Sequence, residues 1–173
     1  TTQTAARASA FAQAVKAQYV NYDSIGVGAG VRGASKSLPA NFLAVATSES
    51  PRNGFVIDNE AIHNRDHYLN LRAQLWWELR IRCERAYQHV NDIKHWSLDD
   101  MISLPNHAGL IAELSQPTFD YNAAGKIRIE EKKHMLKRGV RSPNYADALT
   151  LLIAQPKRVA SVQRRQVTSK GWT

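Results

Sequence analysis

The sequence is short of cysteine, since Cys83 is the only one among its 173 residues. A single thiol can form neither an internal disulfide nor a zinc site built from cysteines. No stretch approaches the roughly 20 apolar residues of a membrane span, and Thr1 to Ala6 lack the charged and then apolar pattern of a signal peptide. We therefore expect a soluble, cytosolic protein that binds no membrane. Cys83 is expected to lie on a helix, with its thiol in the protein core.

Acidic residues are also few, with 15 Asp and Glu against 23 Lys and Arg, which gives a formal net charge of +8. This balance favours a polyanionic partner, nucleic acid first of all, over an acidic protein surface. The length and the hydrophobic content of 43% are typical of one globular domain with its own core. Residues 155–173 turn basic and polar, which predicts a mobile tail after a domain of residues 1–154.

Local patterns predict helices and strands in mixed order. The alanine-rich residues 4–17 favour a helix, whose expected inward face is Ala5, Ala8, Phe11, Ala12 and Val15. Residues 19–22 predict a strand that ends at Asp23, and residues 42–46 predict a second buried strand.

Three more elements follow along the chain. Residues 64–90 predict a long helix with an apolar stripe of Leu71, Leu75, Leu79 and Cys83. Residues 126–130 alternate apolar and charged side chains, as a half-exposed strand does. A last helix is expected to have Pro143 at its first position and to turn Ala146, Leu149, Ile153 and Ala154 inward.

A glycine-rich stretch comes directly after Asp23, and Gly28 to Gly33 match the dinucleotide fingerprint G-x-G-x-x-G. A nucleotide-binding strand would run straight into the first glycine, whereas here Asp23 and Ser24 intervene and a carboxylate would repel pyrophosphate. A flexible turn is one alternative. In the other, Asp23 is a metal ligand, and Gly26, Gly28 and Gly30 let the backbone pass close to the metal and a phosphodiester.

Asp147 lies between apolar residues of the last predicted helix. A lone buried carboxylate is unfavourable by several kcal/mol unless it is paired or bound to a cation. Asp147 therefore either faces solvent on a polar stripe or meets a cation. Two or three carboxylates from distant parts of a chain can hold Mg²⁺ or Mn²⁺ for phosphodiester cleavage, and Asp23 and Asp147 are the candidates.

A cluster of basic residues precedes this helix and is either a DNA-phosphate contact or a solvated face. Its members are Lys126, Arg128, Lys132, Lys133, Lys137 and Arg138. Glu130 and Glu131 lie within it and weaken its positive charge. His63 and His67 have i, i+4 spacing, so one helix face could present them to a metal, but no motif places a third ligand and two surface histidines are favoured.

Four blocks of the sequence resemble, in the same order, the nuclease domain of the large terminase subunit of tailed bacteriophages. They are residues 22–31, 70–80, 125–132 and 137–149. The resemblance implies a ribonuclease H-like α/β fold, a mixed sheet flanked by helices with an auxiliary β-hairpin near residues 121–131. It also implies a Mg²⁺- or Mn²⁺-dependent endonuclease that cuts double-stranded DNA during genome packaging in the host cytoplasm, with the portal protein and the small terminase subunit as partners.

Within this family Asp23 looks like the second metal-binding acid and Asp147 like the last. The family's first acid and first strands precede the helix at residues 4–17, and its ATPase motor carries a phosphate loop that this sequence lacks. The resemblance thus predicts a fragment, weakly active or inactive by itself. The alternative function is a non-catalytic terminase piece that binds DNA or docks on the portal.

Overall fold

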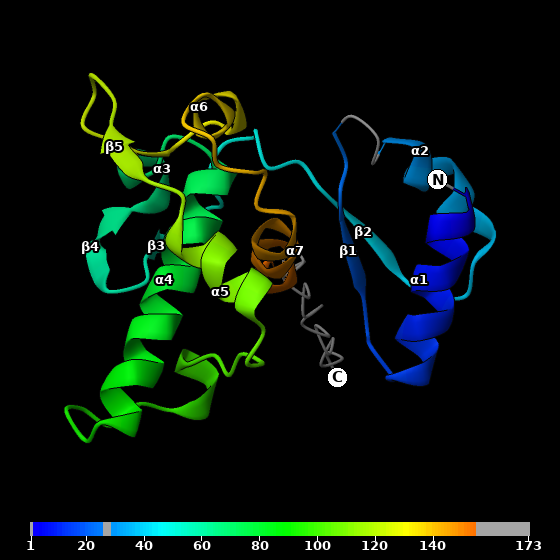
Figure 1. Ribbon diagram of the computed structural model, residues 1–173, viewed down its shortest axis with the longest axis horizontal. Helices are drawn as coiled ribbons and strands as arrows, with labels where there is room; N and C mark the ends of the chain where they lie inside the picture. Colours follow the sequence, from blue (N-terminus) through cyan, green and yellow to red (C-terminus); the bar gives the residue numbers. More distant parts are fainter. Residues whose placement is uncertain (1, 26–28, 155–173) are drawn as a thin grey trace, which may run out of the picture.

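The computed structural model describes residues 2–25 and 29–154, which form a mixed α/β fold (Figure 1). Its strands are β1 (Val20–Asp23), β2 (Phe42–Val45), β3 (Phe55–Val56), β4 (Asn59–His63), β5 (Phe119–Tyr121) and β6 (Ile127–Ile129). Its α-helices are α1 (Thr2–Ala14), α2 (Ala29–Ala34), α3 (Asn64–His67), α4 (Leu71–Val90), α5 (Ala108–Ser115), α6 (Lys132–Lys137) and α7 (Asn144–Ile153). Short 3-10 turns, η2 (Ser35–Ser37) and η3 (Leu98–Asp100), complete the described elements.

The helix α7 connects two parts of the molecule. In Figure 1, α1, α2, β1 and β2 lie on one side of it, and α3 to α6 lie with β3 to β6 on the other. The side-chain amide of Asn21 on β1 donates to the carbonyl oxygens of Leu151 and Ala154 at 2.7 and 3.0 Å. The end of α7 is therefore fastened to β1, while its body packs on α4 and α5.

Strands β1 and β2 are parallel, and Asp23 is paired with Val45 at their carboxyl ends. Both predicted strands are confirmed as strands, but β2 is not buried throughout, since only Val45 is fully buried and Ala44 is exposed. Parallel strands end at the same edge of a sheet, so Asp23 and the residues that follow β2 come together there. Ser24 continues the pairing by donating its backbone N–H to the carbonyl of Val45 at 3.1 Å.

The predicted face of α1 was wrong in part. Ala5, Ser9 and Ala12 are buried, whereas Phe11 and Val15 are 69% and 54% exposed. An alanine-rich helix can pack closely along the face that carries its smallest side chains. Hydrophobicity alone does not predict which face that is. The helix also ends at Ala14, three residues before the predicted end.

The long helix predicted at residues 64–90 is interrupted at Tyr68. This residue is extended, pairs with Ile127 of β6 and is fully buried. A new helix, α4, then begins after Asn70, whose side chain accepts the backbone N–H of Ala73 at 2.9 Å. The predicted stripe is buried at Leu71, Leu75 and Leu79, but Cys83 is only half-buried. Burial raises the pKa of the Cys83 thiol.

The predicted hairpin is confirmed, with β5 and β6 antiparallel and Gly125 at a φ of 73° in the turn. Ile127 and Ile129 are buried and Arg128 is exposed, as a half-exposed strand requires. Pro143 precedes the first residue of α7 instead of occupying it. Ala146 and Ala154 are buried as predicted.

No helix among residues 2–25 and 29–154 has the length and apolar character to cross a membrane. The predicted basic tail, residues 155–173, lies outside the described residues.

Candidate functional site

Asp147 lies in the first turn of α7 and its side chain is 23% exposed. Its Oδ2 atom is 2.6 Å from the Nζ atom of Lys132, at the start of α6. The carboxylate is therefore neither fully solvated nor buried without a partner. Ala146 and Thr150, its neighbours on α7, are buried, so Asp147 sits at the border between the core and the surface.

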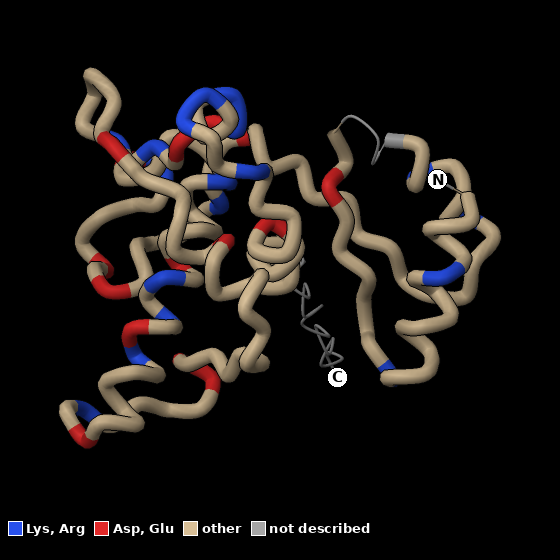
Figure 2. Tube along the Cα trace, in the orientation of Figure 1, with Lys and Arg blue, Asp and Glu red and all other residues tan. Residues whose placement is uncertain are grey.

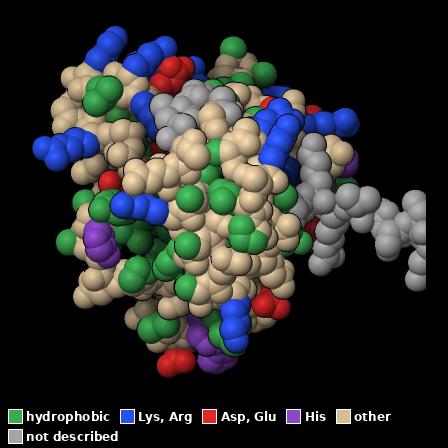
Figure 3. Space-filling model, turned by 90° about the vertical axis from the view of Figure 1, so that its right-hand side faces the viewer, with side chains coloured by type: hydrophobic (Ala, Val, Ile, Leu, Met, Phe, Trp, Pro, Cys, Tyr) green, Lys and Arg blue, Asp and Glu red, His purple; other side chains and the backbone are tan. Residues whose placement is uncertain are grey.

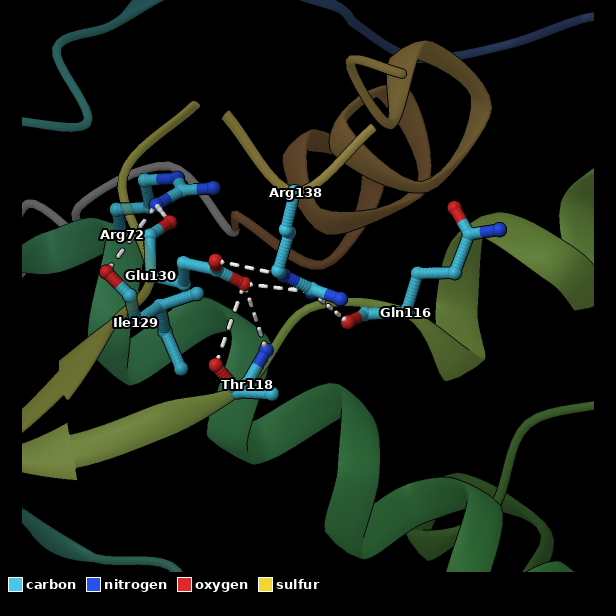
Figure 4. A network of polar contacts seen from close by, with 6 residues as sticks. All are labelled: Arg72, Gln116, Thr118, Ile129, Glu130 and Arg138. Carbon is cyan, nitrogen blue, oxygen red and sulfur yellow. Dashed lines mark hydrogen bonds and ion pairs between the residues drawn. The ribbon is translucent and has the colours of Figure 1, made fainter. Parts of the chain in front are cut away.

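Arg72 is a second cation whose charge interacts with that of Asp147, and no motif in the sequence marks it. Its guanidinium donates to the backbone oxygens of Glu130 at 2.8 Å and of Ile129 at 3.5 Å, at the end of β6 (Figure 4). Burial lowers the pKa of Arg72, while the negative charges of Asp147, Glu131 and Glu130 oppose that shift. The chain around Asp147 thus brings two cationic side chains toward one carboxylate.

Asp23 is the last residue of β1 and is exposed, as predicted for a strand that presents it at its end. Its Oδ1 atom accepts the backbone N–H of Ile25 at 3.0 Å. This contact turns the chain away from the sheet, as Asp commonly does in turns. Gly26 and Gly28 lie outside the described residues, and Gly30 lies within α2.

A cavity of about 480 Å³ opens at the carboxyl ends of β1 and β2. Tyr22 and Ser24 line it from either side of Asp23, and Arg32 and Glu49 contribute one charge of each sign. Nothing in the sequence marks Glu49, because it lies in a polar loop without a motif. The cavity leaves space at the strand ends next to Asp23, which is not itself a lining residue.

Asp23 and Asp147 lie on elements that pack directly on each other, because Asn21 of β1 holds the end of α7. Their close approach around one cation remains a prediction. Among the described residues, no group of three His, Cys, Asp or Glu side chains gathers as a metal site would require.

The six basic residues of the predicted DNA surface belong to the hairpin and to α6 with its C-cap Arg138, and Figure 2 shows Lys and Arg positions along α6. Four of them form ion pairs, each with a different carboxylate. The pairs are Arg128 with Asp120, Lys132 with Asp147, Lys133 with Glu131 and Arg138 with Glu130, all at 2.6 or 2.7 Å. Lys126 donates from Nζ to the backbone oxygen of Arg65 at 2.6 Å. Within the described residues Lys137 forms no ion pair.

The pair of Arg138 and Glu130 is part of a larger network (Figure 4). Arg138 also donates to the backbone oxygen of Gln116 at 2.5 Å, and Thr118 donates to Glu130 from both its backbone N–H and its hydroxyl. The hydrogen bond from Arg138 is the main reason why the pKa of Glu130 falls to about 2. This network fastens α6 to the strand β6 and to the end of α5.

His63 and His67 do not form a metal pair on one helix face. His63 belongs to β4 and stacks on Phe55 with ring centroids 4.4 Å apart. His67 lies at the end of α3 against Tyr68, and burial lowers its pKa.

Comparison with solved structures gives close matches over most of the chain. The nuclease domain of the large terminase subunit of bacterial virus Sf6 is 30% identical, with a TM-score of 0.79 over 90% of this chain and 73% of that chain. A mutant of the same domain solved with manganese is 28% identical, with a TM-score of 0.77 over 90% of this chain and 74% of that chain. The sequence matches no protein-family model and no curated protein.

Proposed function

This chain belongs to the family of phage large-terminase nuclease domains, and from that membership we propose that it is an endonuclease. In this proposal it cuts double-stranded DNA with Mg²⁺ or Mn²⁺ during packaging of the phage genome. We assign residues 1–154 to the nuclease domain, which the basic residues 155–173 follow in the sequence. We further propose the portal protein and the small terminase subunit as partners and the host cytoplasm as the location. These proposals rest on family membership alone.

The observation that carries the proposal is the half-buried Asp147 with a cation 2.6 Å from its carboxylate. A position that already accommodates the ammonium group of Lys132 is suited to positive charge. Asp23 adds an exposed carboxylate at the end of β1. Carboxylate oxygens are the ligands that Mg²⁺ and Mn²⁺ prefer, so the chemistry of both side chains fits such an ion.

We assign Asp23 and Asp147 as metal ligands and so as catalytic residues. When bound, the ion supplies an activated water and stabilises the leaving oxygen of the phosphodiester. Asp23 would hold it from the sheet and Asp147 from α7, two elements fastened to each other through Asn21. Lys132 balances the charge of Asp147. Gly26, Gly28 and Gly30 follow Asp23 and are proposed to let the backbone approach the phosphodiester.

The basic residues of the hairpin and α6 are proposed to hold the DNA backbone near Asp147. Lys132 touches this acid, and the other basic residues lie on the same two elements. Lysine contacts to phosphates carry little sequence information, so this surface would hold DNA of any sequence.

Incubation of duplex plasmid with the chain, with and without chelator, tests the proposal. We expect slow nicking that requires Mn²⁺ or Mg²⁺ and stops with chelator. Asp23→Asn and Asp147→Asn should each lower the rate by about 10²-fold, because loss of a ligand displaces the attacking water.

Asp92→Asn is the matched control, since Asp92 lies in the exposed turn after α4 and Asn tolerates its φ of 55°. Equal rates in all three variants would refute the assigned roles. DNA binding with neither cleavage nor any binding of Mn²⁺ would favour the alternative, a non-catalytic piece that binds DNA or docks on the portal.

A further inference from the structure

A small cationic pocket, lined by neither Asp23 nor Asp147, lies between the loop before β3 and the start of α3. Its volume is about 230 Å³. We call it the Arg52 pocket, and its lining residues are Arg52, Asn53, Gly54, His63 and Arg65. No Asp or Glu lines it. The residues that line it thus include two arginines, a histidine and an asparagine, and no acidic residue.

The loop that carries Arg52 is held in place by two buried polar side chains. Gln74, which is 3% exposed, accepts the backbone N–H of Arg52 at 2.7 Å. Asn64, which is 4% exposed, donates from its side chain to the carbonyl of Arg52 at 3.3 Å and from its backbone to Gly54 at 2.9 Å. Gly54 has a φ of 124°, a conformation that other residues rarely adopt. The pocket is thus preorganised, and a ligand need not order this loop.

The charges in the pocket are only weakly compensated. Burial lowers the pKa of Arg52, and the charge of Glu78 opposes that shift, but within the described residues Arg52 forms no ion pair. Arg65 meets Asp66 at 3.8 Å, with both side chains more than half exposed, a geometry that contributes little. A half-buried guanidinium that no carboxylate contacts directly is stabilised when an anion binds beside it.

The donor set indicates the chemical class of that anion. Guanidinium groups bind phosphate oxygens through paired N–H donors. His63 offers a ring N–H in either protonation state and is held in place by its stacking on Phe55. The structure therefore points to a single phosphate group as the ligand of this pocket.

The pocket adjoins the hairpin, because Lys126 donates from Nζ to the backbone oxygen of Arg65 at 2.6 Å. A polymer with regularly spaced phosphates that lies along the hairpin can therefore place one of them beside Arg52. We propose that the Arg52 pocket binds a backbone phosphate of duplex DNA and extends the DNA surface from the hairpin to β4. This inference rests on the proposed function for the identity of the polymer.

Duplex DNA binding measured by fluorescence anisotropy over a range of salt concentrations, without divalent metal, tests the inference. We compare the chain with a double variant, His63→Gln with Arg65→Gln, and with Arg7→Gln as control. His63, Arg65 and Arg7 are all exposed, so these changes leave the core intact. Arg7 lies on α1, on the other side of the molecule (Figure 1).

We expect the double variant to bind more weakly and its log–log salt slope to fall by about one unit, the value for one lost phosphate contact. Arg7→Gln should leave the slope unchanged. Arg52→Lys keeps the charge but not the paired donors, so we expect it to retain the slope and lose part of the affinity.

Two outcomes would overturn the inference. In the first, the double variant has the same DNA affinity and salt slope as the unsubstituted chain, while Lys137→Ala weakens binding. This result would leave the proposed function standing. The second comes from NMR titration of the chain with inorganic phosphate and with duplex DNA. If the His63 ring signals move only with inorganic phosphate, the pocket binds free phosphate and not DNA. Absence of any DNA binding by the unsubstituted chain would instead count against the proposed function itself.

Discussion

The basic residues of the hairpin and α6 outnumber those of the Arg52 pocket, yet they face more negative charge. Four of the six cations on the hairpin and α6 touch a carboxylate at 2.6 or 2.7 Å. No carboxylate lines the pocket, and the ion pair of its Arg65 with Asp66 is longer, at 3.8 Å. Two of those carboxylates, Asp120 and Asp147, come from outside the basic stretch of sequence. Positive charge counted along a sequence is therefore not the charge that a surface presents to DNA.

The distribution of the remaining Lys and Arg side chains supports the same conclusion about charge. Figure 3 shows Lys and Arg side chains dispersed over the face that carries α1 and α2, without a single patch. A net charge of +8 thus does not locate a binding surface. The pairing of each cation has to be known before it is counted as a phosphate contact.

Arg85 gives the extreme case of a compensated cation and the largest predicted effect. Its side chain is 7% exposed, pairs with Asp58 and with Asp100 at 3.0 Å, and lies 4.4 Å from the ring centroid of Trp96. Arg85→Ala leaves both carboxylates without their partner. We expect the free energy of unfolding to fall by about 3 kcal/mol, the lower end for a broken buried pair, because both aspartates are half exposed.

Urea denaturation measures this effect, with Arg80→Ala as the control. Arg80 is 57% exposed and meets Glu84 at 3.7 Å, so its loss should lower the free energy of unfolding by less than about 1 kcal/mol. Equal losses for the two variants would show that burial does not separate structural cations from surface cations in this molecule.

The next prediction concerns the paired lysines on α6. Replacement of Lys132, Lys133 and Lys137 together by Ala should lower the log–log salt slope of DNA binding by about one unit, not three. Lys132 and Lys133 already neutralise carboxylates, so Lys137 is the main source of a phosphate contact among them. Lys137→Ala alone should give nearly the same salt slope as the triple variant. A fall of three units would mean that DNA displaces the carboxylates, and the contrast with the Arg52 pocket would disappear.

The smallest effect is expected from Arg138→Gln and depends on pH. Arg138 holds the pKa of Glu130 at about 2, below its ordinary value of 4.5. A carboxylate whose pKa is lowered by folding stabilises the folded state. This stabilisation is complete at pH values above the pKa of the unfolded state, and it is lost as the pH falls to the pKa of the folded state. Stability should therefore decline between about pH 4.5 and pH 2, and less steeply in the variant, whose Glu130 is closer to its ordinary pKa.

Urea denaturation of both proteins at pH 6 and pH 3 measures this difference. The chain should lose more stability than Arg138→Gln between the two pH values. Identical losses would mean that the pair of Arg138 and Glu130 does not persist in solution.

The elements that the sequence predicted correctly are those with a local pattern. β1, β2, β6 and the apolar stripe of α4 follow from alternation or from i, i+4 spacing, which neighbouring residues determine. The errors lie where a distant partner decides. Tyr68 leaves the helical pattern because it pairs with Ile127, and α1 buries Ser9 instead of Phe11 because of what it packs against.

The candidate site also combines features that follow from local sequence with features that depend on distant partners. The sequence placed Asp23 at the end of a strand and Asp147 in the last helix, because both positions follow from local pattern. It could not show that Lys132 reaches Asp147, that Arg72 approaches it, or that Arg52 and Arg65 line one pocket. Those contacts depend on how α4, α6 and α7 pack and on how α3 meets the loop before β3, and no single segment of sequence encodes that packing.

The most direct test of the metal assignment is a titration of the chain with Mn²⁺, followed by electron paramagnetic resonance of the free ion. We expect Asp23→Asn and Asp147→Asn each to weaken Mn²⁺ binding by roughly tenfold or more, at least the loss seen when an outer-shell partner of a metal site is removed. Asp92→Asn should bind as the unsubstituted chain does. Unchanged Mn²⁺ affinity in both Asp23→Asn and Asp147→Asn would contradict the claim that these two carboxylates hold the metal.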